Sequence, residues 1–300
     1  MLEIYIKLLP VFAFFSLGVV LKTLKLASNK HGEFLLKFMF FATFPVLILI
    51  KLSQVHIGAN QLYLPFINIA INLICMVIML IVTRNMEIER KTKGVMLISS
   101  MILNNLFIFP FILAVYDDQA FSDAVIFDIG NGIMTLTLTY AVALSYGANK
   151  TTASSILLNI LKLPVMWALA LAIFLNINAI KLAPTFISIF DPFGLLTSPL
   201  ILISLGIFFT VKVKNIKLIA ITVFIRMFAG VLVGLTIATI LGLQGPTFAI
   251  VVLCAAAPIG FNALTYTALA KLDMDFASSA VSISILIGIV TIPILMYLLQ

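Results

Sequence analysis

The chain has very little charge, although charged residues make up much of the surface of a soluble protein. Asp, Glu, Lys and Arg together account for 10% of the 300 residues, whereas apolar residues account for 63%. A soluble domain is usually about 25% charged and about 45–50% apolar. The mean hydropathy of +1.25 points the same way. The composition therefore indicates an integral membrane protein with no separate soluble domain.

Residues that carry metal, redox or hydrolytic chemistry are also scarce. The two cysteines, Cys75 and Cys254, lie inside apolar runs, where we expect small buried side chains without a disulfide. The two histidines, His31 and His56, fall in loops that we expect on opposite sides of the membrane. The sequence has no paired His and acid ligands, no nucleophile beside a base and no nucleotide-binding loop. We therefore expect no enzyme, no metal and no resident cofactor.

Long apolar runs fill the chain. A spanning helix needs about 20 apolar residues, so the chain has room for about ten. The expected spans are residues 4–21, 33–52, 61–83, 94–116, 122–146, 152–176, 185–210, 216–241, 246–270 and 276–298. The sequence thus predicts an all-α membrane protein of ten transmembrane helices with short loops.

The basic residues are distributed unevenly over the loops. Those that follow odd-numbered spans carry Lys22, Lys25, Lys30, Arg84, Arg90, Lys91, Lys93, Lys150, Lys212, Lys214, Lys217 and Lys271. The opposite side carries Lys7, Lys51 and Lys181. By the positive-inside rule, both termini lie on the non-cytoplasmic side of the cytoplasmic (inner) membrane. The net charge of +7 is then a topology signal, and we expect no nucleic-acid partner.

Three acidic residues cluster between the fourth and fifth spans, namely Asp117, Asp118 and Asp123. Several carboxylates close together are the ligands that a hard cation prefers. A solvated loop is the simpler interpretation, and it is the one we expect.

The ten spans divide into two sets of five. Because five is odd, the two sets have opposite orientations, as in the inverted repeats of many secondary transporters. Pro10 and Pro45 recur as Pro164 and Pro199, with the same offset of 154 residues. We expect residues 1–146 to form the first five-helix repeat and residues 152–300 the second, inverted one.

Two apolar runs combine a helix-breaking proline with asparagine. The residues are Asn104, Asn105 and Pro110 in the fourth span and Pro258, Gly260 and Asn262 in the ninth. Proline removes a backbone donor, and freed polar groups in a span are tolerated where they face protein or a wet cavity. We therefore expect the fourth and ninth helices to be broken and to cross near the bilayer midplane. Their half-helix N-termini would face an anion there.

Each of these residues also has a structural interpretation. An asparagine amide offers two donors and one acceptor, which suits a carboxylate but also suits hydrogen bonds between helices. Pro110 and Pro258 can kink a helix without forming a site. Gly260 lets two backbones approach closely, whether or not a ligand binds between them.

Three polar residues inside the fifth and eighth spans complete the candidate set. An ionisable group within a span is by default a functional hypothesis. Asp128 is a candidate to carry a coupling proton, to coordinate sodium with Asn131, or to orient the crossing helices. Alternatively, it is a structural acid paired with an amide or with Arg226. Arg226 itself is expected to pair with Asp128, to attract an anionic substrate, or to extend its side chain to the membrane surface.

The order of several motifs resembles the auxin efflux carrier family, which includes plant auxin carriers and bacterial malate or malonate permeases. Near the C-terminus these motifs are Ala257-Pro258-Ile259-Gly260-Phe261-Asn262-Ala263, then Ala277-Ser278-Ser279-Ala280 and Thr291-Ile292-Pro293. Asn104-Asn105 before Pro110, and Phe127-Asp128-Ile129-Gly130-Asn131-Gly132, are also similar to this family. One departure is that Phe109 precedes Pro110, where the family usually has a nearby glycine.

The resemblance implies a fold like that of sodium/proton antiporters and bile acid symporters. Spans 1, 2, 6 and 7 would form a scaffold that makes a homodimer, and spans 3–5 and 8–10 a transport domain that moves as an elevator. The implied function is secondary transport, or facilitated passage, of small mono- or dicarboxylate anions, with a proton or sodium as candidate coupling ion. The alternatives are a sodium-coupled symporter of the bile acid type and a membrane sensor without transport.

Overall fold

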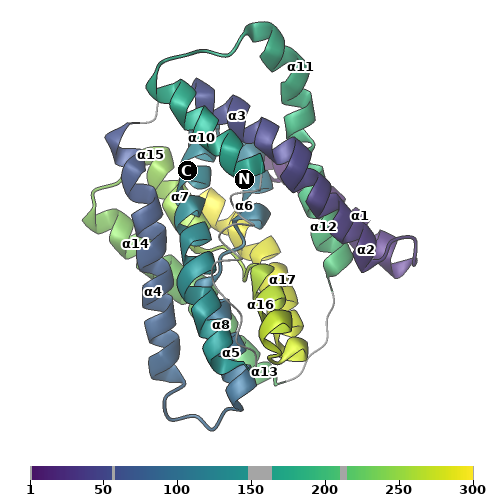
Figure 1. Ribbon diagram of the computed structural model, residues 1–300, viewed down its shortest axis with the longest axis vertical. Helices are drawn as coiled ribbons and strands as arrows, with labels where there is room; N and C mark the ends of the chain where they lie inside the picture. The colour runs from purple at the N-terminus through teal and green to yellow at the C-terminus, as the bar shows by residue number, and fades with distance from the viewer. Residues whose placement is uncertain (1, 56–57, 148–163, 210–214, 300) are drawn as a thin grey trace. The chain divides into compact units, whose positions relative to one another are not determined.

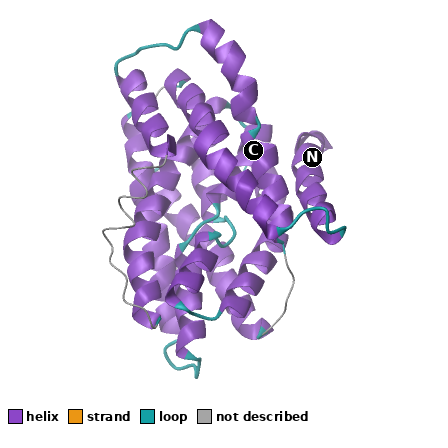
Figure 2. Cartoon of the chain, turned by 45° about the vertical axis from the view of Figure 1, so that its right-hand side comes forward, coloured by secondary structure: helices purple, strands orange, loops and turns teal. Residues whose placement is uncertain are grey.

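The computed structural model describes residues 2–55, 58–147, 164–209 and 215–299, and the regular structure in these ranges is helical (Figures 1 and 2). Seven of the described helical segments are long and apolar enough to cross a membrane. They are Ile6–Thr23, Asn29–Gln54, Gln61–Val82, Asp118–Tyr146, Pro184–Phe208, Ile216–Ile240 and Met274–Leu298. The all-helical membrane fold is therefore confirmed.

The described residues do not include the other three expected spans as continuous helices of that length, for two reasons. The fourth and ninth are interrupted, so each is divided into two short helices. The sixth, residues 152–176, begins outside the described residues, and only its part from Pro164 onward is seen.

The chain forms two compact units. Unit 1 comprises Met1–Gln61, Phe109–Val125 and Ser154–Phe209, and unit 2 comprises Leu62–Ile108, Ile126–Ala153 and Thr210–Gln300. The described helices of unit 1 are α1 (Leu2–Thr23), α2 (Asn29–Phe38), η1 (Met39–Thr43), α3 (Phe44–Gln54), α10 (Pro164–Ile177), α11 (Pro184–Leu195) and α12 (Thr197–Phe208). Three elements contribute to both units: η2 (Ala59–Tyr63), α6 (Asn105–Val115) and α7 (Asp118–Met134).

Unit 2 contains the remaining helices. They are α4 (Leu64–Val82), α5 (Arg90–Met101), η3 (Thr135–Thr139), α8 (Tyr140–Tyr146), α13 (Ile216–Val223), η4 (Phe224–Ala229), α14 (Gly230–Ile240), α15 (Gly245–Ala255), α16 (Asn262–Ala270) and α17 (Met274–Leu298). Helix α5 packs against α4, α8 and α17, so it lies in the middle of this unit.

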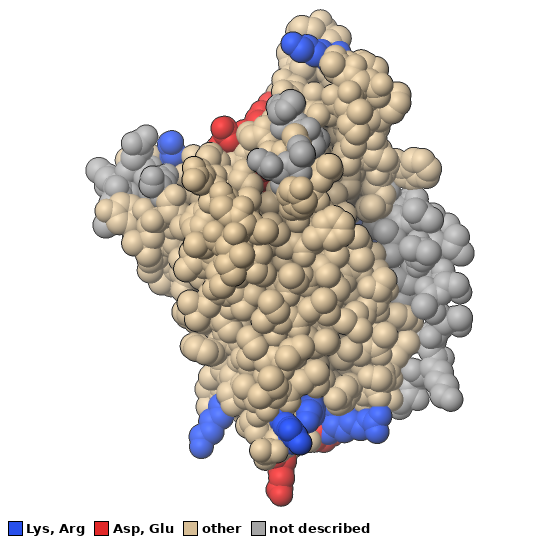
Figure 3. Space-filling view, turned by 90° about the vertical axis from the view of Figure 1, so that its left-hand side faces the viewer, with Lys and Arg blue, Asp and Glu red and all other residues tan. Residues whose placement is uncertain are grey.

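One end of unit 2 is strongly polar. Arg90 there donates a hydrogen bond to the Ser145 carbonyl, and Lys93 donates one to the Thr83 carbonyl. Figure 3 shows Lys and Arg side chains gathered at the lower edge of one face, below a broad surface without charged groups. Apolar side chains such as Phe66 and Ile81 on α4 remain exposed, as expected for helices that face lipid.

Unit 1 contains a charged cluster of three residues from three elements. The Lys51 ammonium on α3 lies 3.2 Å from a carboxylate oxygen of Asp118 on α7 and 3.2 Å from one of Asp191 on α11. The Lys51 side chain is only 12% exposed. Because this ammonium is largely shielded from water, the two carboxylates are its main partners. Its ion pairs with them hold α3, the start of α7 and α11 together.

The acidic cluster before and at the start of α7 is a solvated loop only at Asp117, which is exposed. Asp118 pairs with Lys51, and Asp117 accepts a hydrogen bond from the Ala120 amide, which caps the helix. Asp123 is fully buried and accepts a hydrogen bond from Gln119. The expectation of a solvated loop was therefore wrong for Asp118 and Asp123, because the spacing of these acids in the sequence does not reveal their partners.

We predict that Lys51→Met lowers the free energy of unfolding by about 1–3 kcal/mol, since it leaves two carboxylates without their cation. Thermal unfolding in detergent measures the effect. Lys37→Met is the matched control, because Lys37 is exposed on α2. Equal melting temperatures for the two variants would show that the cluster contributes nothing to stability.

Candidate functional site

Two helices of unit 2 are interrupted, and the interruptions lie against each other. Residues 102–104 separate α5 from α6, and residues 256–261 separate α15 from α16. Leu103 and Ile259 form an isolated antiparallel bridge. The backbone amide of Asn104 donates to the Pro258 carbonyl at 2.9 Å, and the backbone amide of Gly260 donates to the Ile102 carbonyl at 3.0 Å. Each interruption therefore satisfies backbone groups that the other one frees.

Asn104 caps α6. Its side-chain Oδ1 accepts a hydrogen bond from the Phe107 amide at 3.2 Å, which is the usual bond of an N-cap residue. The Asn104 side-chain amide nitrogen is buried and has no partner among the described residues. Asn104 therefore fixes the start of the half-helix and keeps one unused donor beside it.

The interruption is not at Pro110, contrary to our expectation. Pro110 lies in the second turn of α6, and the helix continues past it. Proline removes only one hydrogen bond from a helix, whereas the Asn104 cap and the bridge at Leu103 satisfy the groups that a complete break exposes. The asparagines, and not the proline, mark the first interruption.

Asn105, Asp128 and Asn131 form a network at the same point. Asp128 Oδ1 accepts hydrogen bonds from the amide groups of Asn105 at 2.7 Å and Asn131 at 2.8 Å. Asn131 also accepts from the Leu103 amide and donates to the Leu103 carbonyl, both at 3.1 Å. Asp128 is thus paired with two amides, and Asn131 replaces the backbone partner that Leu103 has lost.

In the second interruption the predicted residues have different surroundings. Pro258 and Gly260 are buried within the crossing, whereas the Asn262 side chain, at the first residue of α16, is exposed. A Cβ atom on Gly260 would lie 2.6 Å from Ile102 Cγ2 and 2.8 Å from the Leu103 carbonyl oxygen. The lack of a side chain at Gly260 is therefore what lets the two backbones meet.

Arg226 lies at the opposite, C-terminal ends of the half-helices. Its side chain is fully buried. Its guanidinium donates to the carbonyls of Ser100, near the end of α5, and Ala255, at the end of α15, both at 3.0 Å. Since helix C-termini carry partial negative charge, this cation stabilises two of them at once. Its described hydrogen bonds all go to neutral oxygen atoms, so it does not pair with Asp128 or extend to the surface.

Two asparagines that the sequence analysis did not select extend this arrangement. Asn72 Oδ1 lies 3.4 Å from the Arg226 guanidinium, and Asn72 donates to Asn68 Oδ1 at 2.8 Å. Both side chains are fully buried on α4. Two asparagines four residues apart in an apolar span lie on one helix face, and this spacing was the signal available in the sequence.

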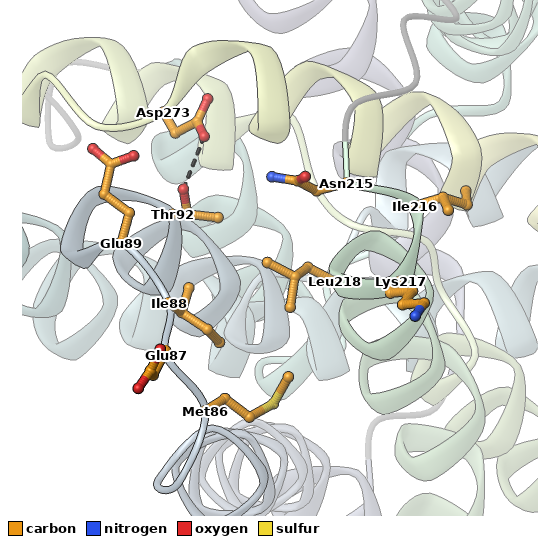
Figure 4. A pocket seen from close by; sticks show the side chains of 10 residues that line it. All are labelled: Met86, Glu87, Ile88, Glu89, Thr92, Asn215, Ile216, Lys217, Leu218 and Asp273. Carbon is orange, nitrogen blue, oxygen red and sulfur yellow. Dashed lines mark hydrogen bonds between the residues drawn. The ribbon is translucent and has the colours of Figure 1, made fainter.

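A separate surface cavity of about 690 Å³ opens at the polar end of unit 2 (Figure 4). Apolar Ile88 and Leu218 line it together with the acidic residues Glu89 and Asp273. Asp273 accepts a hydrogen bond from Thr92 and caps α17 through the Phe276 amide. None of the predicted site residues lines this cavity, so we place the candidate site at the crossing instead.

Two comparisons with known proteins found similar sequences. The model of a family described as membrane transport protein matches residues 3–296. The chain belongs to this family, which is the auxin efflux carrier-like family. An uncharacterized transporter of Methanothermobacter thermautotrophicus is 23% identical over 285 residues, which cover 93% of this chain and 92% of that protein. The expected resemblance is confirmed, and the family indicates a membrane transporter rather than an enzyme.

We predict that Gly260→Ala destabilises this transporter by about 1–3 kcal/mol, because the added Cβ meets a backbone oxygen that cannot move aside. Gly132→Ala is the control, since a Cβ there meets nothing within 4 Å. Helix propensity makes alanine neutral or better at position 132. Thermal unfolding of both variants is the measurement, and equal stability would contradict the close contact at Gly260.

Proposed function

We propose that the protein is a secondary transporter or facilitator of small organic acid anions, mono- or dicarboxylates, across the cytoplasmic membrane. The observation that carries this proposal is the pair of interrupted helices joined at Leu103 and Ile259. Interrupted helices that meet inside a membrane protein are where secondary transporters bind substrate.

The partial charges of the helix ends at the crossing favour an anion, and the nearby Asp128 carboxylate is compatible with one once it holds a proton or a cation. The N-termini of α6 and α16 carry partial positive charge, and both begin beside asparagine. Arg226 offsets the negative partial charge at the C-termini of α5 and α15. The positive partial charge at the N-termini of α6 and α16 is therefore not cancelled by those C-termini. A carboxylate held by Asn104, Asn105 and Asn262 would complete the arrangement, with Pro258 and Gly260 shaping the backbone around it. Pro110, inside α6, belongs to this site only through the helix that it shares with the asparagines.

Asp128 is the candidate coupling residue. It orients the Asn105 amide through the 2.7 Å hydrogen bond, so a proton or a sodium ion at Asp128 would alter the substrate site directly. With Asn131 it supplies the oxygen atoms that sodium prefers. A proton would instead remove the charge that holds the two amides in place.

Contacts at a constant sequence offset support the inverted repeat. Thr43 and Thr197 share a hydrogen bond of 2.9 Å, and they are 154 residues apart. Asn72 and Arg226 are also 154 residues apart and in contact, and Pro10/Pro164 and Pro45/Pro199 repeat that offset. Equivalent residues of two repeats related by a two-fold axis meet only near the axis. This pattern favours ten spans in two inverted repeats, residues 1–146 and 152–300.

The composition of the two units supports an elevator mechanism. Unit 1 contains the helices expected in the scaffold, together with Phe109–Val125 of the expected transport domain, and unit 2 contains the crossing. In this proposal the scaffold forms a homodimer, and unit 2 carries the anion. Both termini lie on the non-cytoplasmic side, because the basic end of unit 2 faces the cytoplasm.

The proposal predicts uptake of at least one labelled acid from a panel of acetate, lactate, malonate and succinate into proteoliposomes. Asn105→Ala and Asn262→Ala should each lower the uptake rate by about tenfold, the factor expected for one lost hydrogen bond to a charged group. Asn178→Ala, at an exposed position in unit 1, should have no effect.

Other outcomes separate the alternatives. Uptake of a bile acid that requires a sodium gradient would favour the bile acid type of symporter. Thermal stabilisation by an acid without any uptake would favour a membrane sensor. If no acid is taken up and none stabilises the protein, the proposal is wrong.

A second prediction concerns coupling. Asp128→Asn keeps an oxygen atom for Asn105 and Asn131 but cannot exchange a proton. We expect uptake driven by an imposed pH gradient to be lost, while exchange of the same acid across the membrane persists. Asp275→Asn, at an exposed position near the start of α17, is the control. Gradient-driven uptake that survives Asp128→Asn would restrict Asp128 to orienting the crossing.

A further inference from the structure

The bridge between the interruptions leaves specific backbone groups without a backbone partner. In an antiparallel pair of this kind, the flanking residues exchange hydrogen bonds, and the two residues directly opposite each other point their own N–H and C=O groups outward. Here the flanking bonds run from Asn104 to Pro258 and from Gly260 to Ile102. The amides of Leu103 and Ile259 therefore need acceptors from other helices.

The two halves meet this need with different side chains. Asn131 on α7 accepts from the Leu103 amide at 3.1 Å. Ser284 on α17 does the same for the second half, because its Oγ accepts from the Ile259 amide at 3.1 Å. The Ser284 hydroxyl donates in turn to the Val281 carbonyl at 2.7 Å, so its lone pairs are directed to the amide. Ser284 and Ile259 are both fully buried.

One turn further along α17, Gly288 touches both halves of the crossing. A Cβ atom there would lie 2.7 Å from Pro258 Cγ and 3.1 Å from Phe107 Cε1. Ser284 and Gly288 are four residues apart and so lie on one helix face. On this face of α17, Ser284 accepts the hydrogen bond of the Ile259 amide. The lack of a side chain at Gly288 lets Pro258 and Phe107 pack directly against the helix.

We infer that Ser284 and Gly288 are positioning residues of the second half of the site. They set the path of residues 258–261 and thereby the orientation of Asn262 and the N-terminus of α16. The inference rests on the proposed function only in taking this N-terminus as part of the substrate site. It also assigns the two halves different chemistry, because the α7 support includes the carboxylate of Asp128 and the α17 support is uncharged.

A cysteine reporter tests the inference without any substrate. Asn262→Cys places a thiol at an exposed position directly after the second interruption, while the native Cys75 and Cys254 are buried. The rate of labelling by N-ethylmaleimide is measured in this background and after addition of Ser284→Ala or Gly288→Ala. We expect Ser284→Ala and Gly288→Ala each to change the labelling rate of the Asn262→Cys thiol by about tenfold. This factor corresponds to one lost hydrogen bond or one displaced contact. Ser284→Thr, which keeps the hydroxyl, should restore the rate.

Two controls separate positioning from general loosening. Ser278→Ala removes a half-buried serine of the same helix whose described hydrogen bond stays within α17, and it should leave the rate unchanged. A second reporter, Asn85→Cys, lies at an exposed position in the turn after α4 and should react at the same rate in all variants. Melting temperatures are recorded in parallel.

Equal labelling of the Asn262→Cys reporter with and without Ser284→Ala and Gly288→Ala would overturn the inference, and so would equal changes at both reporters. If Ser284→Ala does not fold, the Gly288→Ala and Ser284→Thr results decide. Because no substrate is involved, failure to find a transported acid would contradict the proposed function and leave this result unaffected.

Discussion

The hydrogen bonds between the two interrupted backbones are the constraint on which the rest of unit 2 depends. A helix that stops inside a membrane exposes backbone groups whose solvation in lipid would cost several kcal/mol each. Here the two interrupted helices satisfy each other's backbone groups. The backbone amide of Asn104 donates to the Pro258 carbonyl, and that of Gly260 donates to the Ile102 carbonyl. Each half therefore depends on the other for backbone partners, so residues far apart in the sequence must be positioned together. Gly260 is required for that reason, since any side chain would separate the two strands of backbone.

The same constraint explains a fully buried arginine. Where two helices end at one place, their free carbonyls concentrate negative partial charge. The Arg226 guanidinium has five donors in a planar arrangement, and it bonds to Ser100 on one helix and to Ala255 on the other. Gly230 leaves the room for this group, since a Cβ there would lie 2.6 Å from its Nη2. The arginine therefore belongs to the crossing, although the sequence suggested pairing, substrate attraction or exposure at the surface.

Much of the fold was predictable, because apolar runs of about 20 residues reveal membrane helices directly. The interrupted fourth and ninth spans were also predictable, since each apolar run combines asparagine with a helix-breaking proline. The position of the first break was not, because Pro110 is a stronger local signal than the Asn104 cap. The partners of Arg226 were not predictable either. The carbonyls of Ser100 and Ala255 become available only once both helices end side by side, and that depends on tertiary structure.

The two halves of the crossing have similar backbones and different chemistry, and this difference bears on mechanism. In the first half, Leu103 is held by Asn131, which is itself bonded to Asp128. In the second half, Ile259 is held by the neutral hydroxyl of Ser284. A change of charge at Asp128 would therefore act on Asn105 and Leu103 first and would reach Asn262 only through the backbone bridge. If the crossing binds an anion with both halves, as proposed, a coupling ion at Asp128 would act directly on only the first of them.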